Sequence, residues 1–265
     1  MRYIENKIAS PDNIIIKSFY WLECDKIEQF QFFLPDGNPE LMVSDFPISV
    51  LSTSKSTIKT GSCLFWGQYR FPGYINCSQP YKMFGIKFQP WELRLITNSH
   101  YPLLVDRIVS GDLVFSPTII KYIHGLIKNN DFKKPLYHIE EELSDLLVTE
   151  ILSECMEQKS LIKTIVKLRN NPELKITKLL FEYDKSLRTL QYHFQQNIGI
   201  SPKQYQKIVR LRNVSEKIKS GKKIVHAVLD SGYYDQAHFN REFKSITLKS
   251  PSQFSWKENL ILSTL

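Results

Sequence analysis

The stretch DSGYYDQAHFNREFK, at residues 230–244, constrains the fold more tightly than any other part of the sequence. At 3.6 residues per turn, its apolar residues recur on one side of a helix; they are Phe239, Phe243 and, just beyond, Ile246. Small or hydrogen-bonding residues fall roughly on the opposite side; they are Ala237, Asn240, Arg241 and Lys244. Asp235 is placed to cap the helix, because its carboxylate can accept hydrogen bonds from the first free N–H groups. The pattern predicts an amphipathic helix over residues 235–247.

The same arrangement occurs a second time, about fifty residues earlier in the chain. Ser186 is the expected N-cap of a helix over residues 186–197, and its apolar stripe is Leu187, Leu190 and Phe194. The opposite side of this helix carries Arg188, Gln191, Tyr192 and Gln195. Between the two copies, Ser201-Pro202 marks the start of a long helix and Gly221 its end. The sequence therefore predicts two helix-turn-helix units joined by a stiff helix.

The first part of the chain has a different pattern. Residues 14–88 contain short runs rich in β-branched and aromatic residues, separated by turn signals such as LPDG and FPGY. Such spacing predicts a sheet, sandwich or barrel. The eighteen aromatic residues before position 105 could line an apolar effector pocket or form the core of the sheet, and we expect the core.

Helical patterns begin after Pro90. We expect helices over residues 91–98, 117–130, 139–156, 161–170, 175–183, 186–197, 201–220, 222–231 and 235–247, and a short one after Pro251. The apolar stripe of 139–156 could pack on its own domain or on a second subunit. The expected fold class is α+β. A mainly β domain at 1–158, a small barrel or sandwich with flanking helices, is followed at 159–258 by an all-α domain with both helix-turn-helix units.

Charge is distributed unevenly between these two parts. Residues 1–160 hold 16 Lys and Arg against 19 Asp and Glu, whereas residues 161–257 hold 19 against 7. A helical domain with this excess of basic residues is typical of proteins that contact phosphates. Arg can bond guanine through two hydrogen bonds, and Gln or Asn can do the same for adenine. The outward side chains of the two units are therefore suited to double-stranded DNA, with one helix in each of two successive major grooves.

Signals for other functions are weak. The four cysteines lie far apart and no histidine stands at metal-ligand spacing, so we expect no metal and no cofactor. We find no nucleophile elbow, glycine-rich phosphate loop or paired histidine ligands, and we expect no enzyme. Two alternatives stay open: a cysteine-based sensor or enzyme in the first domain, and a protein that binds nucleic acid without sequence preference. Without a signal peptide or a long apolar run, a cytoplasmic location with no membrane contact is expected.

Three motifs in residues 161–255 carry a resemblance to a known family. They are S-x-R-x-L-x-x-x-F at 186–194, G-x-S-P-x-x-Y at 199–205 followed by Arg210-Leu211, and G-Y-x-D-Q-A-H-F-x-R-x-F from Gly232 to Phe243, with S-P-S-x-F at 250–254. This region resembles the DNA-binding domain of AraC/XylS transcriptional regulators. The first domain resembles, through Trp21, LPDG at 34–37 and GIKFQP at 85–90, a poorly characterised domain often found ahead of that module.

The resemblance implies a one-component regulator. Its first domain would bind a small effector or form a homodimer, and its second would bind promoter DNA and contact RNA polymerase. Base contacts in this family come from outward positions of the two recognition helices. Here these positions are Arg188, Gln191 and Tyr192, then Gln236, Ala237, Asn240 and Arg241; Gln195 and Lys244 on the same faces complete the expected DNA-binding set.

Several positions depart from the family pattern. Tyr192 stands where Arg is common, and Leu180 and Val228 replace a small Ala under each turn. Asp184 and Leu248 replace a turn Gly, and Leu tolerates the left-handed conformation poorly. His193 and His238 are expected to make structural hydrogen bonds to the backbone rather than to contact DNA or metal.

Overall fold

A computed structural model describes residues 2–7, 15–25, 31–52, 57–91, 104–129, 136–151, 159–183, 185–254 and 256. The strands are β1 (Arg2–Lys7), β2 (Ile16–Cys24), β3 (Gln31–Phe33), β4 (Glu40–Ser52), β5 (Thr57–Trp66), β6 (Gly73–Asn76), β7 (Tyr81–Phe88) and β8 (Ile108–Ser110). The helices are the short η2 (Gly111–Leu113), then α2 (Pro117–Lys128), α3 (Leu136–Ile151), α4 (Lys159–Asn170), α5 (Ile176–Tyr183), α6 (Leu187–Asn197), α7 (Pro202–Lys219), α8 (Ile224–Leu229) and α9 (Gln236–Thr247).

The N-terminal strands form one antiparallel sheet, in the order β1-β2-β7-β4-β5-β8, and β3 pairs with β6, which also pairs with β4. Strand β4 is the longest of the described strands, and its two ends pair with different neighbours. Its first half, residues 40–44, pairs with β7, and its last residues, 49–52, pair with β6. The β4–β5 register shifts between Val43 and Ile48, where residues 45–47 are exposed. The expectation of a mainly β first domain is confirmed.

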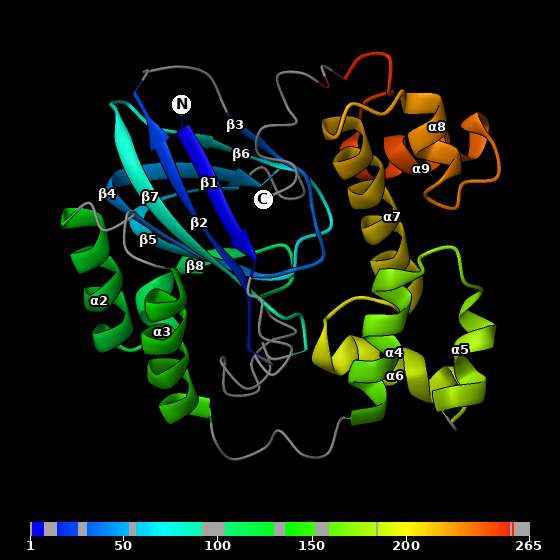
Figure 1. Cartoon of the computed structure of the whole chain (residues 1–265), viewed down its shortest axis with the longest axis horizontal. Helices are drawn as coiled ribbons and strands as arrows, with labels where there is room; N and C mark the ends of the chain where they lie inside the picture. Colours follow the sequence, from blue (N-terminus) through cyan, green and yellow to red (C-terminus); the bar gives the residue numbers. More distant parts are fainter. Residues whose placement is uncertain are drawn as a thin grey trace.

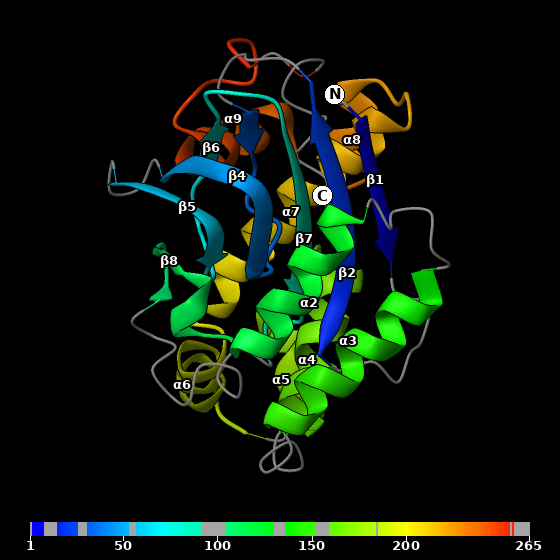
Figure 2. The ribbon, with the colours of Figure 1, turned by 90° about the vertical axis from the view of Figure 1, so that its left-hand side faces the viewer.

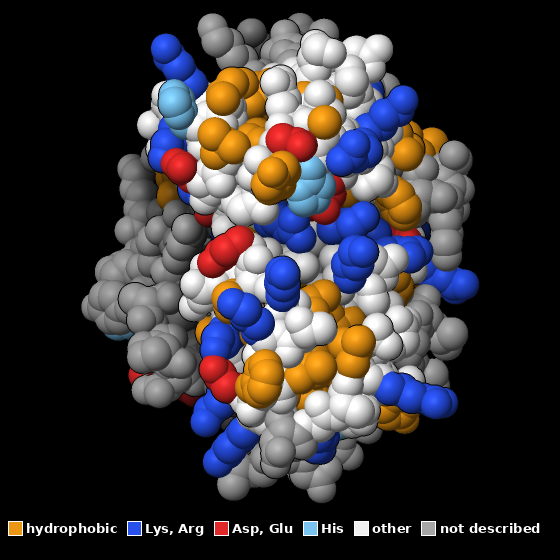
Figure 3. Space-filling model, turned by 90° about the vertical axis from the view of Figure 1, so that its right-hand side faces the viewer, with side chains coloured by type: hydrophobic (Ala, Val, Ile, Leu, Met, Phe, Trp, Pro, Cys, Tyr) orange, Lys and Arg blue, Asp and Glu red, His pale blue; other side chains and the backbone are white. Residues whose placement is uncertain are grey.

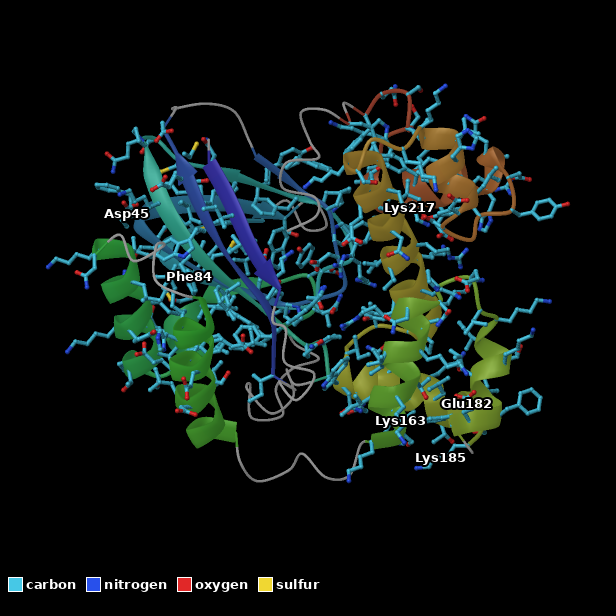
Figure 4. All side chains as sticks on the ribbon, in the orientation of Figure 1. Asp45, Phe84, Lys163, Glu182, Lys185 and Lys217 are labelled. Carbon is cyan, nitrogen blue, oxygen red and sulfur yellow. The ribbon has the colours of Figure 1, made fainter. Side chains whose placement is uncertain are left out.

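Apolar side chains pack on both faces of this bent sheet. One face, with Phe19, Trp21 and Phe84, packs against buried residues of α2 and α3 (Figures 1, 2 and 4). The other face, with Tyr20 and Trp66, forms a second cluster. The N-terminal aromatic residues thus build the core of the sheet, as expected. Helix α3 contributes Ile139, Leu143 and Leu147 to the first cluster, so its apolar stripe packs on its own domain.

The second half of the described chain is helical, and its helices agree with the expected ones to within a few residues. Helix α7 runs between the two helix-turn-helix units, with α4, α5 and α6 at one end and α8 and α9 at the other (Figure 1). After Pro251, residues 251–254 form turns. Most of the helix expected over 91–98, and the residues beyond 256, lie outside the described residues.

The sheet domain contacts both helix-turn-helix units, and we call this contact the domain seam. At one end, Trp91 belongs to the hydrophobic core of the first unit. At the other end, Phe32 and Leu34 belong to the core of the second unit, where the rings of Phe32 and Phe254 lie 5.3 Å apart. Both ends of α7 therefore belong to cores that include residues of the sheet domain.

Two departures from the family pattern have clear structural outcomes. Leu248 ends α9 in the left-handed conformation, with φ of 62°, and its side chain is 60% exposed. Val228 is buried and Leu180 is half-buried, so both larger side chains are accommodated in the cores under the turns. Asp184 lies outside the described residues.

Both histidines differ from the expectation of backbone bonding. The ring of His193 shares a hydrogen bond with the hydroxyl of Tyr183, at 2.5 Å from its Nδ1, which ties α6 to α5. The Nε2 of His238 lies 3.6 Å from a carboxylate oxygen of Glu242, one turn further along α9. Their partners are side chains because both rings point along or between helices, where the backbone is already hydrogen-bonded.

Replacing Leu248 by glycine should stabilise the folded protein. The left-handed conformation costs a residue with a Cβ about 1–2 kcal/mol, and glycine avoids this cost. Because the leucine side chain is mostly exposed, little burial is lost. We expect Leu248→Gly to raise the free energy of unfolding by about 1 kcal/mol in urea titrations. Leu248→Ala keeps the Cβ and should give no such gain; equal values for both variants would contradict the strain at this position.

The His193 pair should make stability depend on pH. Burial, with a smaller effect from Lys185, lowers the pKa of His193. The unfolded chain has the ordinary histidine pKa of about 6.5, so it binds the proton first as the pH falls, and the folded state loses stability below that pH. The fall in thermal midpoint between about pH 7.5 and about pH 5.5 should therefore be smaller in His193→Gln than in the wild type. His226→Gln, at an exposed position on α8, is the control. A fall in thermal midpoint that is as large in His193→Gln as in the wild type would refute the effect.

Candidate nucleic-acid interface

Helix α6 is capped and oriented largely as the sequence predicts. The Ser186 hydroxyl accepts a hydrogen bond from the N–H of Thr189 at 3.1 Å. Leu190 and Phe194 are fully buried, but Leu187 is 38% exposed. The prediction that Leu187 belongs to the buried stripe is therefore wrong. The first turn of α6 lies at the edge of the hydrophobic core, so Leu187 is only partly covered.

The outward side of α6 presents the four predicted side chains, Arg188, Gln191, Tyr192 and Gln195, all exposed. The ring of Tyr192 is 60% exposed. The amide Nε2 of Gln195 donates to the carbonyl of Gly199 at 2.8 Å, so this side chain is turned toward the C-terminal end of its own helix. Arg188, Gln191 and Tyr192 form the freer part of the face.

Helix α9 repeats this construction. A carboxylate oxygen of Asp235 accepts from the N–H of His238 at 2.6 Å, so the predicted cap is present. Phe239, Phe243 and Ile246 are buried in the core that α9 shares with α7 and α8. The predicted outward residues are all exposed: Gln236, Ala237, Asn240, Arg241 and Lys244. Both helices thus combine one buried apolar side with one exposed polar side.

Glu242 is a member of this site that the sequence reading missed. Its side chain is only 5% exposed, and its carboxylate lies 3.9 Å from the Nε of Arg210 on α7 and 3.6 Å from the Nε2 of His238. The guanidinium of Arg210 also lies over the ring of Tyr233, 5.5 Å from its centre. These contacts fix α9 against α7. The signal was present in the sequence, because Glu242 follows Phe239 by three residues and so falls on the buried side of the helix.

The face of the helical region that is turned away from the sheet carries many Lys and Arg side chains and fewer acidic ones (Figure 3). Lys185 follows α5, Lys163 projects from α4 and Lys217 comes from α7 (Figure 4). Some of this charge is paired internally: Lys167 contacts Glu182, and Lys222 contacts Asp230. A face with more exposed cations than anions is suited to a polyanion.

The described residues give little support for a metal site or a reactive cysteine. They contain no cluster of three or more His, Cys, Asp or Glu side chains that could hold a metal ion. Cys24, Cys63 and Cys77 are buried, and burial, with a smaller effect from Asp112, raises the pKa of the Cys63 thiol to about 12. A thiol that stays protonated is a poor nucleophile, which disfavours the cysteine-based alternative for Cys63. Cys155 lies outside the described residues. Among the helices described, none has the length and apolar character needed to cross a membrane.

Comparison with protein families gives two matches. Residues 182–256 match a helix-turn-helix domain family, and residues 13–110 match a domain of unknown function, DUF6597. A segment of 62 residues is 40% identical to an uncharacterized HTH-type transcriptional regulator of Haemophilus influenzae. That segment is 23% of this chain and 21% of the relative, so the likeness extends over about a fifth of the other protein.

Solved structures of ToxT from Vibrio cholerae share the fold along the whole chain. ToxT from strain O395 has a TM-score of 0.56 at 11% identity and covers 99% of this chain and 98% of its own. A second O395 structure, bound to (E)-4-(8-methylnaphthalen-1-yl)but-3-enoic acid, has the same TM-score and identity and covers 98% of each chain. A third, from strain SCE256 and bound to an unsaturated fatty acid, has a TM-score of 0.50 at 11% identity and covers 99% and 96%.

These matches agree with the construction of the two helical units. The family match covers the capped helices α6 and α9 and the helices between them, and it includes only the last residues of α5. The ToxT likeness covers the sheet domain and both units in the same order. Residues 182–256 therefore form a helix-turn-helix domain, and the whole chain shares the fold of ToxT.

Proposed function

We propose that this protein binds promoter DNA in a sequence-specific manner, with α6 and α9 in two successive major grooves. The observation that carries the proposal is the pair of exposed polar helix sides at the two ends of α7. An α-helix rises 1.5 Å per residue, so the 18 residues of α7 span about 27 Å, comparable to the roughly 34 Å between successive grooves. One chain then contacts two successive major grooves, as a dimer of proteins with a single helix-turn-helix unit each does.

Specificity and affinity come from different side chains in this proposal. Arg188, Gln191, Asn240 and Arg241 contact base edges, because these types form paired hydrogen bonds with guanine or adenine. Tyr192 makes stacking or apolar contacts where related proteins use arginine. Surrounding lysines such as Lys185 and Lys244 contact phosphates and release counterions. Gln195, held by Gly199, contributes less than Gln191.

The sheet domain regulates DNA binding by binding a small ligand or a second copy of the chain. Two observations support this part. The sheet is joined to both ends of α7 through the domain seam, so a change in the sheet reaches both recognition helices. ToxT, which shares the fold, has been solved with carboxylic acids bound. A carboxylic acid is therefore the class of effector that we propose, and RNA polymerase is the proposed partner at the promoter.

Replacing Arg241 by alanine should separate its contribution to sequence specificity from its general electrostatic contribution to DNA affinity. We expect Arg241→Ala to weaken binding to the cognate site by about 1–3 kcal/mol while random DNA is affected much less. Fluorescence anisotropy at fixed salt, with cognate and scrambled duplexes of equal length, measures both. Lys163→Ala, which removes an exposed cation on α4 outside both recognition helices, is the control and should change the two affinities equally. If Arg241→Ala lowers the affinity for both duplexes equally, Arg241 contacts phosphates rather than bases.

A further inference from the structure

The two helix-turn-helix units have separate hydrophobic cores. Among the described residues, the buried side chains of the first unit and those of the second form two clusters, each of which includes its own part of α7. An open groove lies between the units, lined by Glu173 of the first unit, Lys217 of α7 and Asp230 of the second unit, together with other residues that are mostly polar. Core packing therefore leaves open what holds one unit against the other.

Helix α7 binds one connecting segment of each unit. Near the start of α7, the Nε2 of Gln206 donates to two carbonyls between α4 and α5, those of Pro172 at 2.8 Å and Leu174 at 2.6 Å. Near the end of α7, the Nζ of Lys217 (Figure 4) donates to the hydroxyl of Ser231, just after α8, at 3.1 Å. The segment before α5 and the segment before α9 are thus both fixed to the same helix.

These two segments touch each other at Gly232 (Figure 1). Gly232 has a φ of 82°, in the left-handed region that glycine adopts without strain. A Cβ at this position would lie 2.5 Å from the Cβ of Glu173 and 3.0 Å from its Cα. Carbon atoms in good contact are about 3.5–4.0 Å apart. The backbone of the second unit therefore lies directly against the first unit, with no room for a side chain.

Gly221 shows that the left-handed conformation alone does not cause this crowding. It follows α7 with a φ of 89°, close to that of Gly232, yet a Cβ at Gly221 would have no atom of the described residues within 4 Å beyond its immediate chain neighbours. Both positions favour glycine for the backbone conformation, and Gly232 also requires it for space. The crowding at Gly232 therefore comes from the contact between the two units.

We propose that the contact of Gly232 with Glu173 is a brace that sets the distance between α6 and α9, so that the protein accepts one spacing of its two half-sites on DNA. Helix α5, which leads into α6, begins three residues after Glu173, and α9 begins four residues after Gly232. A displacement at the brace therefore reaches both recognition helices over short lengths of chain. The inference rests on the proposed function and names the residues that position the two helices for it.

Asparagine at position 232 tests the brace. Asparagine tolerates the left-handed conformation better than most residues, so the main effect of Gly232→Asn is the added Cβ against Glu173. The preferred duplex of the full-length protein is selected from random DNA. Fluorescence anisotropy then compares it with duplexes that have one base pair more or fewer between the half-sites, a change of about 3.4 Å and about 35°.

We expect the wild type to bind both altered spacings at least about tenfold more weakly than the preferred duplex. In Gly232→Asn, affinity for the preferred duplex should fall about tenfold, and one altered spacing should be bound equally well or better. Gly221→Asn is the matched control: it makes the same substitution at the same kind of backbone conformation in open space, and it should keep the wild-type preference. Adding Glu173→Gly to Gly232→Asn gives the new Cβ the vacated space, and most of the preference should return.

The contact itself is measured without DNA. The thermal midpoint of Gly232→Asn should lie about 3–8 °C below that of Gly221→Asn, and Glu173→Gly in the same chain should recover most of this difference. If Gly232→Asn impairs folding, Glu173→Gly alone tests the positioning role, because it removes the contacting Cβ and should narrow the difference between spacings. Glu173→Ala keeps the Cβ without the charge and should keep the wild-type preference.

Several results would overturn the brace. If Gly232→Asn weakens binding equally at every spacing, or lowers the midpoint while the spacing preference stays, Gly232 has only a structural role. If the wild type resists random competitor but binds all three spacings equally, the brace is refuted and the proposed function stands. If no duplex is preferred, the proposed function fails and the role of the brace on DNA fails with it. Additive midpoint changes in the Gly232 and Glu173 variants would refute the contact itself.

Discussion

The burial of one side of each recognition helix against α7 is the contact on which the rest of the structure depends. Phe194 and Leu190 on α6, and Phe239 and Phe243 on α9, each enter a core that includes residues of α7. Because these stripes are buried, the polar sides of both helices must face outward. Caps at Ser186 and Asp235 fix where each helix begins, and the Glu242–Arg210 contact adds a polar restraint at the second unit.

The sheet domain adds a second level of constraint. It contacts the first unit through Trp91 and the second through Phe32, so both ends of α7 pack in cores that the sheet domain shares. Apolar contacts at both ends of α7 therefore form the seam.

Much of the helical region could be predicted from the sequence because helical periodicity and capping residues are local signals. Phe239, Phe243 and Ile246 were placed correctly by spacing alone, and Leu187 was not, because exposure at a helix start depends on how far the core extends. The strands were recognised as a group, but their pairing was not, since β4 joins β7 and β6 through contacts distant in sequence. Spacing places Glu242 on the buried side of α9, but its partner Arg210 could not be predicted, because that contact joins residues distant in sequence. The roles of the outward residues on α6 and α9 stay predictions.

Methylation interference on DNA bound by the full-length protein tests the central claim most directly. The DNA is taken from upstream of the protein's own gene and its neighbours, and binding is done at physiological salt with excess random competitor. The account predicts interference at purines in two major-groove segments about one helical turn apart, on the same face of the duplex. Interference confined to one segment would mean that only one unit reads bases, and a complex that competitor abolishes, with no interference at all, would contradict sequence-specific recognition by this chain.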